Sequence, residues 1–169
     1  MGNLQTDEQL IADQVRVPAA LDEVWEAWTT EEGARGFFAP ACRINLQPGG
    51  AYEMLFDLEA KPGDQGGEGM IVLAVQPKHM LSFTWSAPPH LRTVRGQMTH
   101  VVVRMQQTGP QETSIILRHD GWGDSGEWID AFQYFSRAWS QIVLPRLQYR
   151  FEHGPVDWSN PPPFGRDHG

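Results

Sequence analysis

Histidine is the first residue type to examine for chemistry, because its imidazole can move protons or bind a metal near neutral pH. The chain contains six of them: His79, His90, His100, His119, His153 and His168. No two lie four residues apart on a predicted helix, and none belongs to a cluster of carboxylates with the spacing of metal ligands. A metal site would have to be assembled by the fold, so we predict no metal and no cofactor.

His119 differs from the others because strand alternation turns its side chain towards the interior. Two neighbouring strands place residues of one parity on this inner face: Val101, Val103, Met105, Ile115, Leu117 and His119. A neutral imidazole there can orient a ligand oxygen or act as an acid or base. The alternative, which we favour, is a structural histidine that is hydrogen-bonded to Tyr134, a backbone carbonyl or an ordered water. We expect Trp122, just beyond it, to cap the core rather than stack on a ligand.

Nucleophilic catalysis finds no support in the remaining residues. The chain has no Gly-x-Ser-x-Gly sequence between a strand and a helix, and its single cysteine, Cys42, has no neighbours that mark it as reactive. One cysteine also excludes an internal disulfide and a zinc site built from several thiolates. Residues 63–69 are Gly-rich but lack the Lys and the helix of a phosphate-binding loop. We therefore assign no catalytic residue and favour a protein that is not an enzyme.

The element that must position these residues is a long amphipathic helix predicted over residues 127–152. Its apolar residues recur at spacings of three and four: Trp128, Phe132, Phe135, Trp139, Ile142, Val143 and Leu147. Asp124 followed by Glu127 is typical of an N-cap and the third helical position. Pro145 removes a backbone hydrogen bond, so we expect a kink over residues 141–145. The aromatic stripe must be buried against a sheet formed upstream.

Short strands are predicted for most of the chain before this helix. A first strand, residues 11–17, precedes two short helices, one at residues 20–28 and one that starts at Thr29, where Glu32 completes a capping box. Six further strands follow, at residues 42–46, 51–57, 69–76, 81–85, 98–106 and 113–120. Tight turns join neighbouring strands as hairpins, so the sheet is antiparallel. This order predicts an α+β fold in which a curved sheet grips the final helix.

Composition limits the partners of the chain. Its 169 residues suffice for one domain, which we place at residues 1–153, followed by a Pro-rich C-terminal tail at residues 154–169. Trp158 or Phe164 is expected to anchor this tail. The net charge of −8 and the scattered basic residues argue against nucleic-acid binding. No apolar run has the length of a membrane span or the context of a signal peptide, so we expect a cytoplasmic protein without a membrane partner.

Five pieces of local sequence occur in the order that is typical of one protein family. They are residues 24–29 (VWEAWT) with Pro18 upstream, residues 48–50 (PGG), Pro77 with residues 81–85 (LSFTW), Thr113 leading to His119 and Gly121, and Trp139 with Leu144 and Leu147. Residues 10–153 thereby resemble the bacterial domains named for the activator of the ninety-kilodalton heat-shock protein ATPase, in the START-like (SRPBCC) superfamily. Phe37 and Phe38 stand where the family more often has a Trp, and residues 86–96 form a fuller loop than usual.

The resemblance implies a helix-grip fold, as in the birch-pollen-allergen proteins, with a cavity between sheet and helix that accepts apolar small molecules. Together with the aromatic and inward-facing residues, it gives twelve candidate ligand-binding residues: Phe38, Tyr52, Met54, Phe56, Phe83, Trp85, Val103, Leu117, His119, Trp122, Phe132 and Phe135. Packing of these side chains into a solid core is the alternative. Our leading hypothesis is a non-enzymatic protein that binds a small hydrophobic or aromatic molecule, with His119 or Tyr52 orienting it.

Two other functions stay open at this point. A chaperone-linked, stress-response protein would bind its partner through the outer sheet face or through residues 86–96, where residues 88–91 (PPHL) are expected to expose apolar groups. A cyclase-like or hydrolase-like enzyme would use His119 as its acid or base. The resemblance also implies that two copies pair through an exposed sheet edge or face to form a homodimer.

Overall fold

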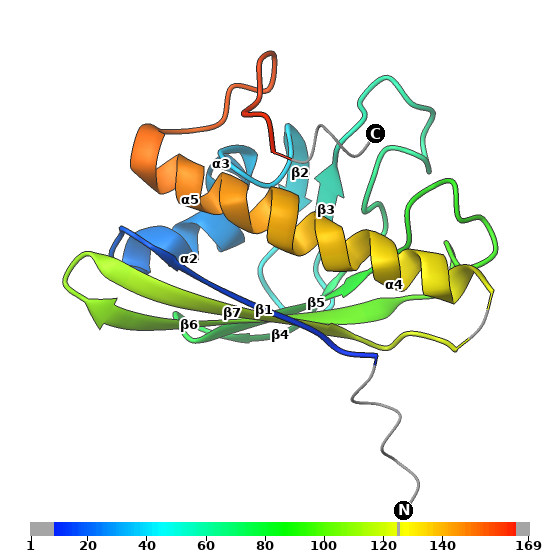
Figure 1. The fold of residues 1–169 in the computed structure, drawn as a ribbon, viewed down its shortest axis with the longest axis horizontal. Helices are drawn as coiled ribbons and strands as arrows, with labels where there is room; N and C mark the ends of the chain where they lie inside the picture. Colours follow the sequence, from blue (N-terminus) through cyan, green and yellow to red (C-terminus); the bar gives the residue numbers. More distant parts are fainter. Residues whose placement is uncertain (1–8, 125, 165–169) are drawn as a thin grey trace, which may run out of the picture.

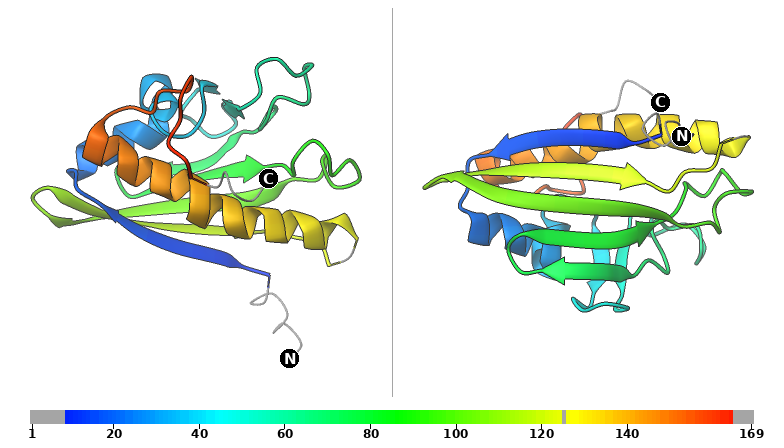
Figure 2. Two further views of the ribbon diagram at one scale, coloured as in Figure 1. Left: turned by 45° about the horizontal axis from the view of Figure 1, so that its top comes forward. Right: turned by 90° about the horizontal axis from the view of Figure 1, so that it is seen from below.

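A long C-terminal helix lies across one face of a curved antiparallel sheet, and two short helices lie on the same side (Figure 1). The computed structural model describes residues 9–124 and 126–164. Seen from below, the other face of the sheet is covered by no helix of this described part (Figure 2). The two-layer α+β arrangement confirms the predicted fold class.

The large sheet has five strands in the order β1 (Ile11–Val17), β7 (Glu112–Asp120), β6 (Thr99–Gly109), β5 (Met80–Trp85) and β4 (Val72–Gln76). A separate hairpin is formed by β2 (Ala41–Ile44) and β3 (Tyr52–Leu55). This hairpin is joined to the β4 end of the sheet by a bridge between Ala51 and Ile71 and by the Tyr52 N–H, which donates to the Met70 carbonyl at 2.8 Å. All strand pairs are antiparallel, as predicted.

The predicted alternation of β6 and β7 is confirmed residue by residue. The register pairs Val101 with His119, Val103 with Leu117 and Met105 with Ile115. All six side chains are at most 5% exposed, so the inner face of these strands forms the centre of the core.

Two short helices follow β1: α2 (Leu21–Thr29) and α3 (Glu31–Arg35). The N-cap of α3 is one residue later than the Thr29 that the predicted capping box indicated. Thr30 is the N-cap of α3, and its hydroxyl accepts from the Gly33 N–H at 3.0 Å. The Thr29 hydroxyl instead donates to the Trp25 carbonyl at 2.6 Å inside α2. Gly33 is needed here because a Cβ at this position would lie 2.2 Å from the Glu26 carbonyl oxygen.

The final helix consists of α4 (Glu127–Ala138), a π-helical turn η1 (Trp139–Val143) and α5 (Leu144–His153). Pro145 has no N–H for the Gln141 carbonyl, and the Leu144 N–H donates to the Trp139 carbonyl five residues back. The expected kink is therefore a π-helical turn, through which the helix continues as one rod (Figure 1). None of the helices in the described residues has the length and apolar character needed to cross a bilayer.

The N-terminus of the final helix differs from the prediction. Its N-cap is Gly126, at φ 61°, and no side chain caps it, so Asp124 is not the N-cap. Glu127 is the first helical residue rather than the third. Its carboxylate accepts from the backbone N–H groups of Thr93 and Val94, at 2.7 and 3.3 Å. The acid thus binds a neighbouring loop instead of completing a cap.

Residues 154–164 fold back onto the helical layer. The Val156 N–H donates to the Gly36 carbonyl at 2.8 Å, and the Trp158 indole N–H donates to the Arg35 carbonyl at 2.6 Å. The Arg146 guanidinium lies 5.0 Å above the Trp158 ring centre. The prediction that Trp158 anchors this segment is confirmed.

Replacement of Gly33 by Ala is expected to destabilise the protein by about 1–3 kcal/mol, because the new methyl group collides with the α2 backbone. Gly96→Ala is the matched control, since a Cβ at Gly96 meets nothing within 4 Å, and its effect should stay within about 0.5 kcal/mol. Urea unfolding measures both. Equal stability of the two variants would contradict the close approach of α2 and α3.

Candidate functional site

A groove of about 400 Å³, open to solvent, runs along the final helix on the side of the β2–β3 hairpin. One wall is helical and consists of Tyr134, Phe135, Ala138, Trp139, Ile142, Val143 and Arg146. The other wall comes from two loops, residues 57–67 between β3 and β4 and residues 86–96 between β5 and β6. Its volume lies within the range of roughly 300–1,000 Å³ that is common for small-molecule sites.

Aromatic rings form the floor of the groove. The Phe38 ring lies 5.7 Å from Trp85 and 5.8 Å from Trp139, and the two indoles lie 6.1 Å apart. All three residues are at most 3% exposed. Phe56 and Tyr134 stand at the rim, and each is 42% exposed. The floor is therefore rigid and apolar, whereas the rim leaves aromatic surface in water.

A buried hydrogen-bond chain lies beneath this floor. The Trp139 indole N–H donates to His119 Nδ1 at 3.0 Å, and His119 Nε2 lies 2.7 Å from the Thr99 hydroxyl. An indole N–H can only donate, so Nδ1 is the acceptor and the single proton of the neutral ring is on Nε2. That proton is donated to the Thr99 oxygen, whose own hydroxyl donates to the Trp85 carbonyl at 3.0 Å. The chain therefore connects the two tryptophans of the floor.

His119 lies in the buried core, at 0% exposure, and not in the groove. Burial lowers its pKa to about 3, with a smaller contribution from His100, so the imidazole is neutral at pH 7. Its partners are Trp139 and Thr99 rather than the Tyr134 that we considered from the sequence.

Four of the twelve candidate residues line the groove: Phe38, Phe56, Trp85 and Phe135. Tyr52 does not, because its ring stacks on Phe83 at 4.3 Å and its hydroxyl donates to the Trp28 carbonyl at 2.7 Å. Met54, Val103 and Leu117 are 0% exposed and belong to the hydrophobic core. Trp122 and Phe132 lie against a smaller cavity of about 140 Å³ near the start of α4. No residue of β1, β6 or β7 lines the groove.

Several groove residues were missed from the sequence. On the helix, Ala138, Trp139, Ile142 and Arg146 follow Phe135 at helical spacing, so the periodicity of the stripe contained the signal. The loop residues carried no such signal, because their contacts join positions that are far apart in the chain.

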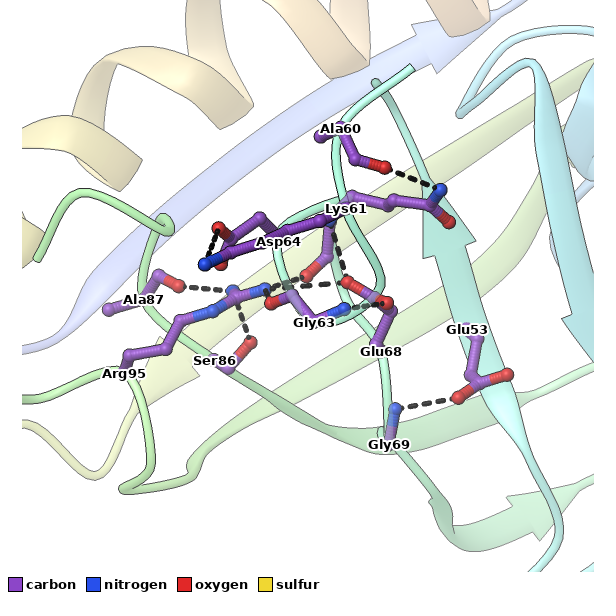
Figure 3. Close-up of polar contacts among 12 residues, drawn as sticks. Glu53, Ala60, Lys61, Gly63, Asp64, Glu68, Gly69, Ser86, Ala87 and Arg95 are labelled. Carbon is purple, nitrogen blue, oxygen red and sulfur yellow. Dashed lines mark hydrogen bonds and ion pairs between the residues drawn. The ribbon is translucent and has the colours of Figure 1, made fainter. Parts of the chain in front are cut away.

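The loop wall is held together by Arg95 (Figure 3). Its guanidinium donates to the carbonyls of Gly63 (2.8 Å), Gly66 (2.6 Å) and Ala87 (2.5 Å), and to the Ser86 hydroxyl (3.0 Å). The side chain is 15% exposed and also lies 3.8 Å from the Glu68 carboxylate. Burial lowers the pKa of Arg95, which still carries its charge at pH 7, since guanidinium groups stay protonated in proteins.

A second, more exposed contact joins the same loops. Arg92 makes two parallel hydrogen bonds, at 2.9 and 3.0 Å, to the carboxylate of Asp64. This contact holds the pKa of Asp64 below its usual range, and Lys61 adds a weaker attraction at 3.9 Å. Glu68 accepts from the Gly63 and Gln65 N–H groups, at 2.5 and 2.7 Å, and so closes the 57–67 loop on itself.

The 86–96 loop does not expose the apolar patch that we expected. Pro88 is buried, Leu91 is 6% exposed and Val94 is 2% exposed, because these residues pack into the core. Of residues 88–91, only His90 is exposed, and its ring lies 6.2 Å from Tyr134. The loop is thus a wall of the groove.

Metal and thiol chemistry receive no geometric support. Within residues 9–124 and 126–164, no three His, Cys, Asp or Glu side chains come close enough together to hold a metal ion. Cys42 donates to the Glu31 carbonyl at 3.4 Å, and burial raises the pKa of its thiol, which keeps it protonated.

Comparison with protein families matches residues 18–152 to the family described as Activator of Hsp90 ATPase homolog 1-like protein. The chain belongs to this family. The match covers α2 to α5, and therefore includes the groove, and ends before the folded-back residues 154–164. No curated protein matches the chain.

Several solved structures share the fold of this chain. A Mesorhizobium loti protein, MLL2253, is 16% identical with a TM-score of 0.67 and covers 87% of this chain and 99% of its own. The Aha1 dimer of Colwellia psychrerythraea is 16% identical with a TM-score of 0.65, over 86% of this chain and 97% of that one. DynU16, from the dynemicin biosynthetic locus, is 22% identical with a TM-score of 0.62, over 87% of this chain. The chain spans about half, 48%, of DynU16. These similarities confirm the helix-grip fold of the family.

His119 should make the stability of this family member fall in acid. Its folded-state pKa of about 3 lies below the usual value of 6.5, so the unfolded chain binds the extra proton first as the pH falls. The stability that a neutral His119 contributes is complete above about pH 6.5 and is lost towards pH 3, at up to about 1.4 kcal/mol per pH unit.

Urea unfolding of the wild type and of His119→Gln isolates this effect, because the variant has no titrating group at this position. The stability difference in favour of the wild type should shrink by about 2 kcal/mol between about pH 7.5 and about pH 5. A constant difference across this range would show that His119 is not held neutral by its burial.

Proposed function

We propose that the groove binds a small, largely apolar or aromatic molecule and that the protein acts as a binder rather than an enzyme. The observation that carries this proposal is a solvent-open cavity of about 400 Å³ whose floor consists of fixed aromatic rings. The rim rings of Phe56 and Tyr134 are the surfaces that such a ligand would cover. Covering roughly 100 Å² of apolar surface contributes about 2.5 kcal/mol.

The polar groups of the groove support binding better than catalysis. Asp64 is engaged by Arg92, and the Arg95 donors are engaged by the two loops. Burial raises the pKa of Tyr134, so its hydroxyl is a neutral donor or acceptor. His119, the residue that an acid–base mechanism would have used, lies beneath the floor with both nitrogens bonded. We therefore do not extend the proposal to a cyclase-like or hydrolase-like reaction.

A chaperone-linked function rests on names and not on geometry. The family carries the name of the Hsp90 activator, and a Plasmodium falciparum protein described as an HSP90 activator shares the fold at 14% identity and a TM-score of 0.61. Of the two surfaces that we considered for such a partner, the outer sheet face and the 86–96 loop, the loop buries its apolar residues Leu91 and Val94. Binding in the groove is the function that we propose.

Ala138→Phe tests the proposal by filling the groove, because the Ala138 side chain lines it on the helical wall. The affinity for the neutral fluorescent probe 6-propionyl-2-dimethylaminonaphthalene should fall by about tenfold or more. Gln141→Phe adds the same ring on the exposed side of the helix and should leave the affinity unchanged. Fluorescence titration measures both dissociation constants. Equal affinities of the two variants, or no binding to the wild type, would contradict the assignment.

A further inference from the structure

The loop wall of the groove consists of two segments that are about thirty residues apart in the chain. Arg95, in one of them, is 32 residues from Gly63 and 29 residues from Gly66, with which it forms hydrogen bonds. Neither loop contains a helix or strand that would fix its position. Figure 3 shows the Arg95 guanidinium between the two loops, with acceptors on both sides. Backbone hydrogen bonds tie the base of the 57–67 loop to β3, for example from the Gly67 N–H to the Met54 carbonyl, whereas the contacts that join the two loops to each other come from side chains.

Arg95 is the more buried of the two arginines that join the loops. It reaches four acceptors: Ser86 and Ala87 belong to its own loop, and Gly63 and Gly66 belong to the 57–67 loop. Arg92 reaches one carboxylate only, and its side chain is 64% exposed against 15% for Arg95. An exposed ion pair contributes little to stability, whereas buried charge-assisted hydrogen bonds are short, directional and costly to lose.

The 86–96 loop is also tied to the helical wall. Glu127, the first residue of α4, accepts from the N–H groups of Thr93 and Val94, directly before Arg95. Glu127 thus connects the 86–96 loop to the helix, and Arg95 connects the 86–96 loop to the 57–67 loop. These contacts tie the loop wall to the helical wall and the two loops of that wall to each other.

We propose that Arg95 is a positioning residue that preforms the groove for its ligand. This inference rests on the proposed function of the groove. Arg95 itself also lines the groove, but this role does not depend on contact with the ligand. Arg95 acts through the backbone of the 57–67 and 86–96 loops, which it holds at the spacing that an apolar guest requires. A preformed site binds more tightly because no loop has to be ordered when the ligand arrives.

Lysine cannot replace Arg95 in this role. A guanidinium presents five N–H donors in a planar fork, whereas an ammonium presents three donors from one point. Arg95→Lys therefore keeps the charge but leaves some of the carbonyls of Gly63, Gly66 and Ala87 without a donor. Arg92→Lys is the matched control, since it is the same substitution on the exposed contact between the same loops.

The test has two readouts on folded protein, with circular dichroism used to choose a temperature at which all variants are folded. Hydrogen exchange without any ligand, followed by mass spectrometry, reports on the 57–67 and 86–96 loops. We expect exchange in both loops to accelerate by about tenfold or more in Arg95→Lys and by less than about twofold in Arg92→Lys. The dissociation constant of 6-propionyl-2-dimethylaminonaphthalene should rise by about tenfold in Arg95→Lys only.

Unchanged exchange in a folded Arg95→Lys variant would overturn the positioning role. Faster exchange with unchanged affinity would overturn its importance for binding. If the wild type binds no probe, the proposed function fails together with the affinity effect, and the exchange measurement then decides the positioning role by itself. Should Arg95→Lys fail to fold, Arg95→Gln, which retains a shorter planar donor, is measured in its place with Arg92→Gln as the control.

Discussion

The indole of Trp139 is buried where the final helix crosses the sheet, and its N–H therefore needs an acceptor inside the protein. His119 provides it, at 3.0 Å, and this bond fixes the tautomer of the imidazole, the orientation of Thr99 and the link to the Trp85 carbonyl. A buried donor without a partner costs about 1–3 kcal/mol, so the arrangement has little freedom to change. The rigid aromatic floor of the groove follows from this chain.

The groove itself follows from the way in which the helix and the sheet divide the interior. Over β6 and β7 the interior is occupied by side chains such as Val103 and Leu117, which are 0% exposed. Towards the β2–β3 hairpin the sheet ends, and two loops rather than a strand face Trp139 and Ile142. Apolar residues such as Leu91 and Val94 anchor the 86–96 loop in the core, charged contacts join it to the 57–67 loop, and the space in front of both loops stays open. Apolar packing thus forms the floor of the groove, and polar contacts join the two loops of its wall.

Periodicity in the sequence was sufficient for the fold. The alternation through Val101 and His119 and the helical stripe through Phe135 and Trp139 each specify one buried face, and the burial of these residues agrees. Local signals were less exact, since Thr30 rather than Thr29 caps α3 and Gly126 rather than Asp124 precedes α4. Both helix starts depend on the backbone angle of one residue.

The site was only partly predictable, because inward-facing residues such as Tyr52 and Phe38 look alike in sequence. Only the position of the loops decides which of these residues lines the open groove. Arg95 was invisible, since its acceptors are backbone carbonyls about thirty residues away.

The central claim is that an apolar molecule lies over Trp85 and Trp139. The most direct measurement is a titration of nitrogen-labelled protein with 6-propionyl-2-dimethylaminonaphthalene, followed through the assigned indole N–H resonances of the tryptophans. We expect saturable shifts for Trp85 and Trp139, while Trp25, which lies in α2 outside the groove, keeps its resonance. Shifts that are confined to tryptophans outside the groove, or no shift at Trp85 and Trp139 at saturation, would contradict it.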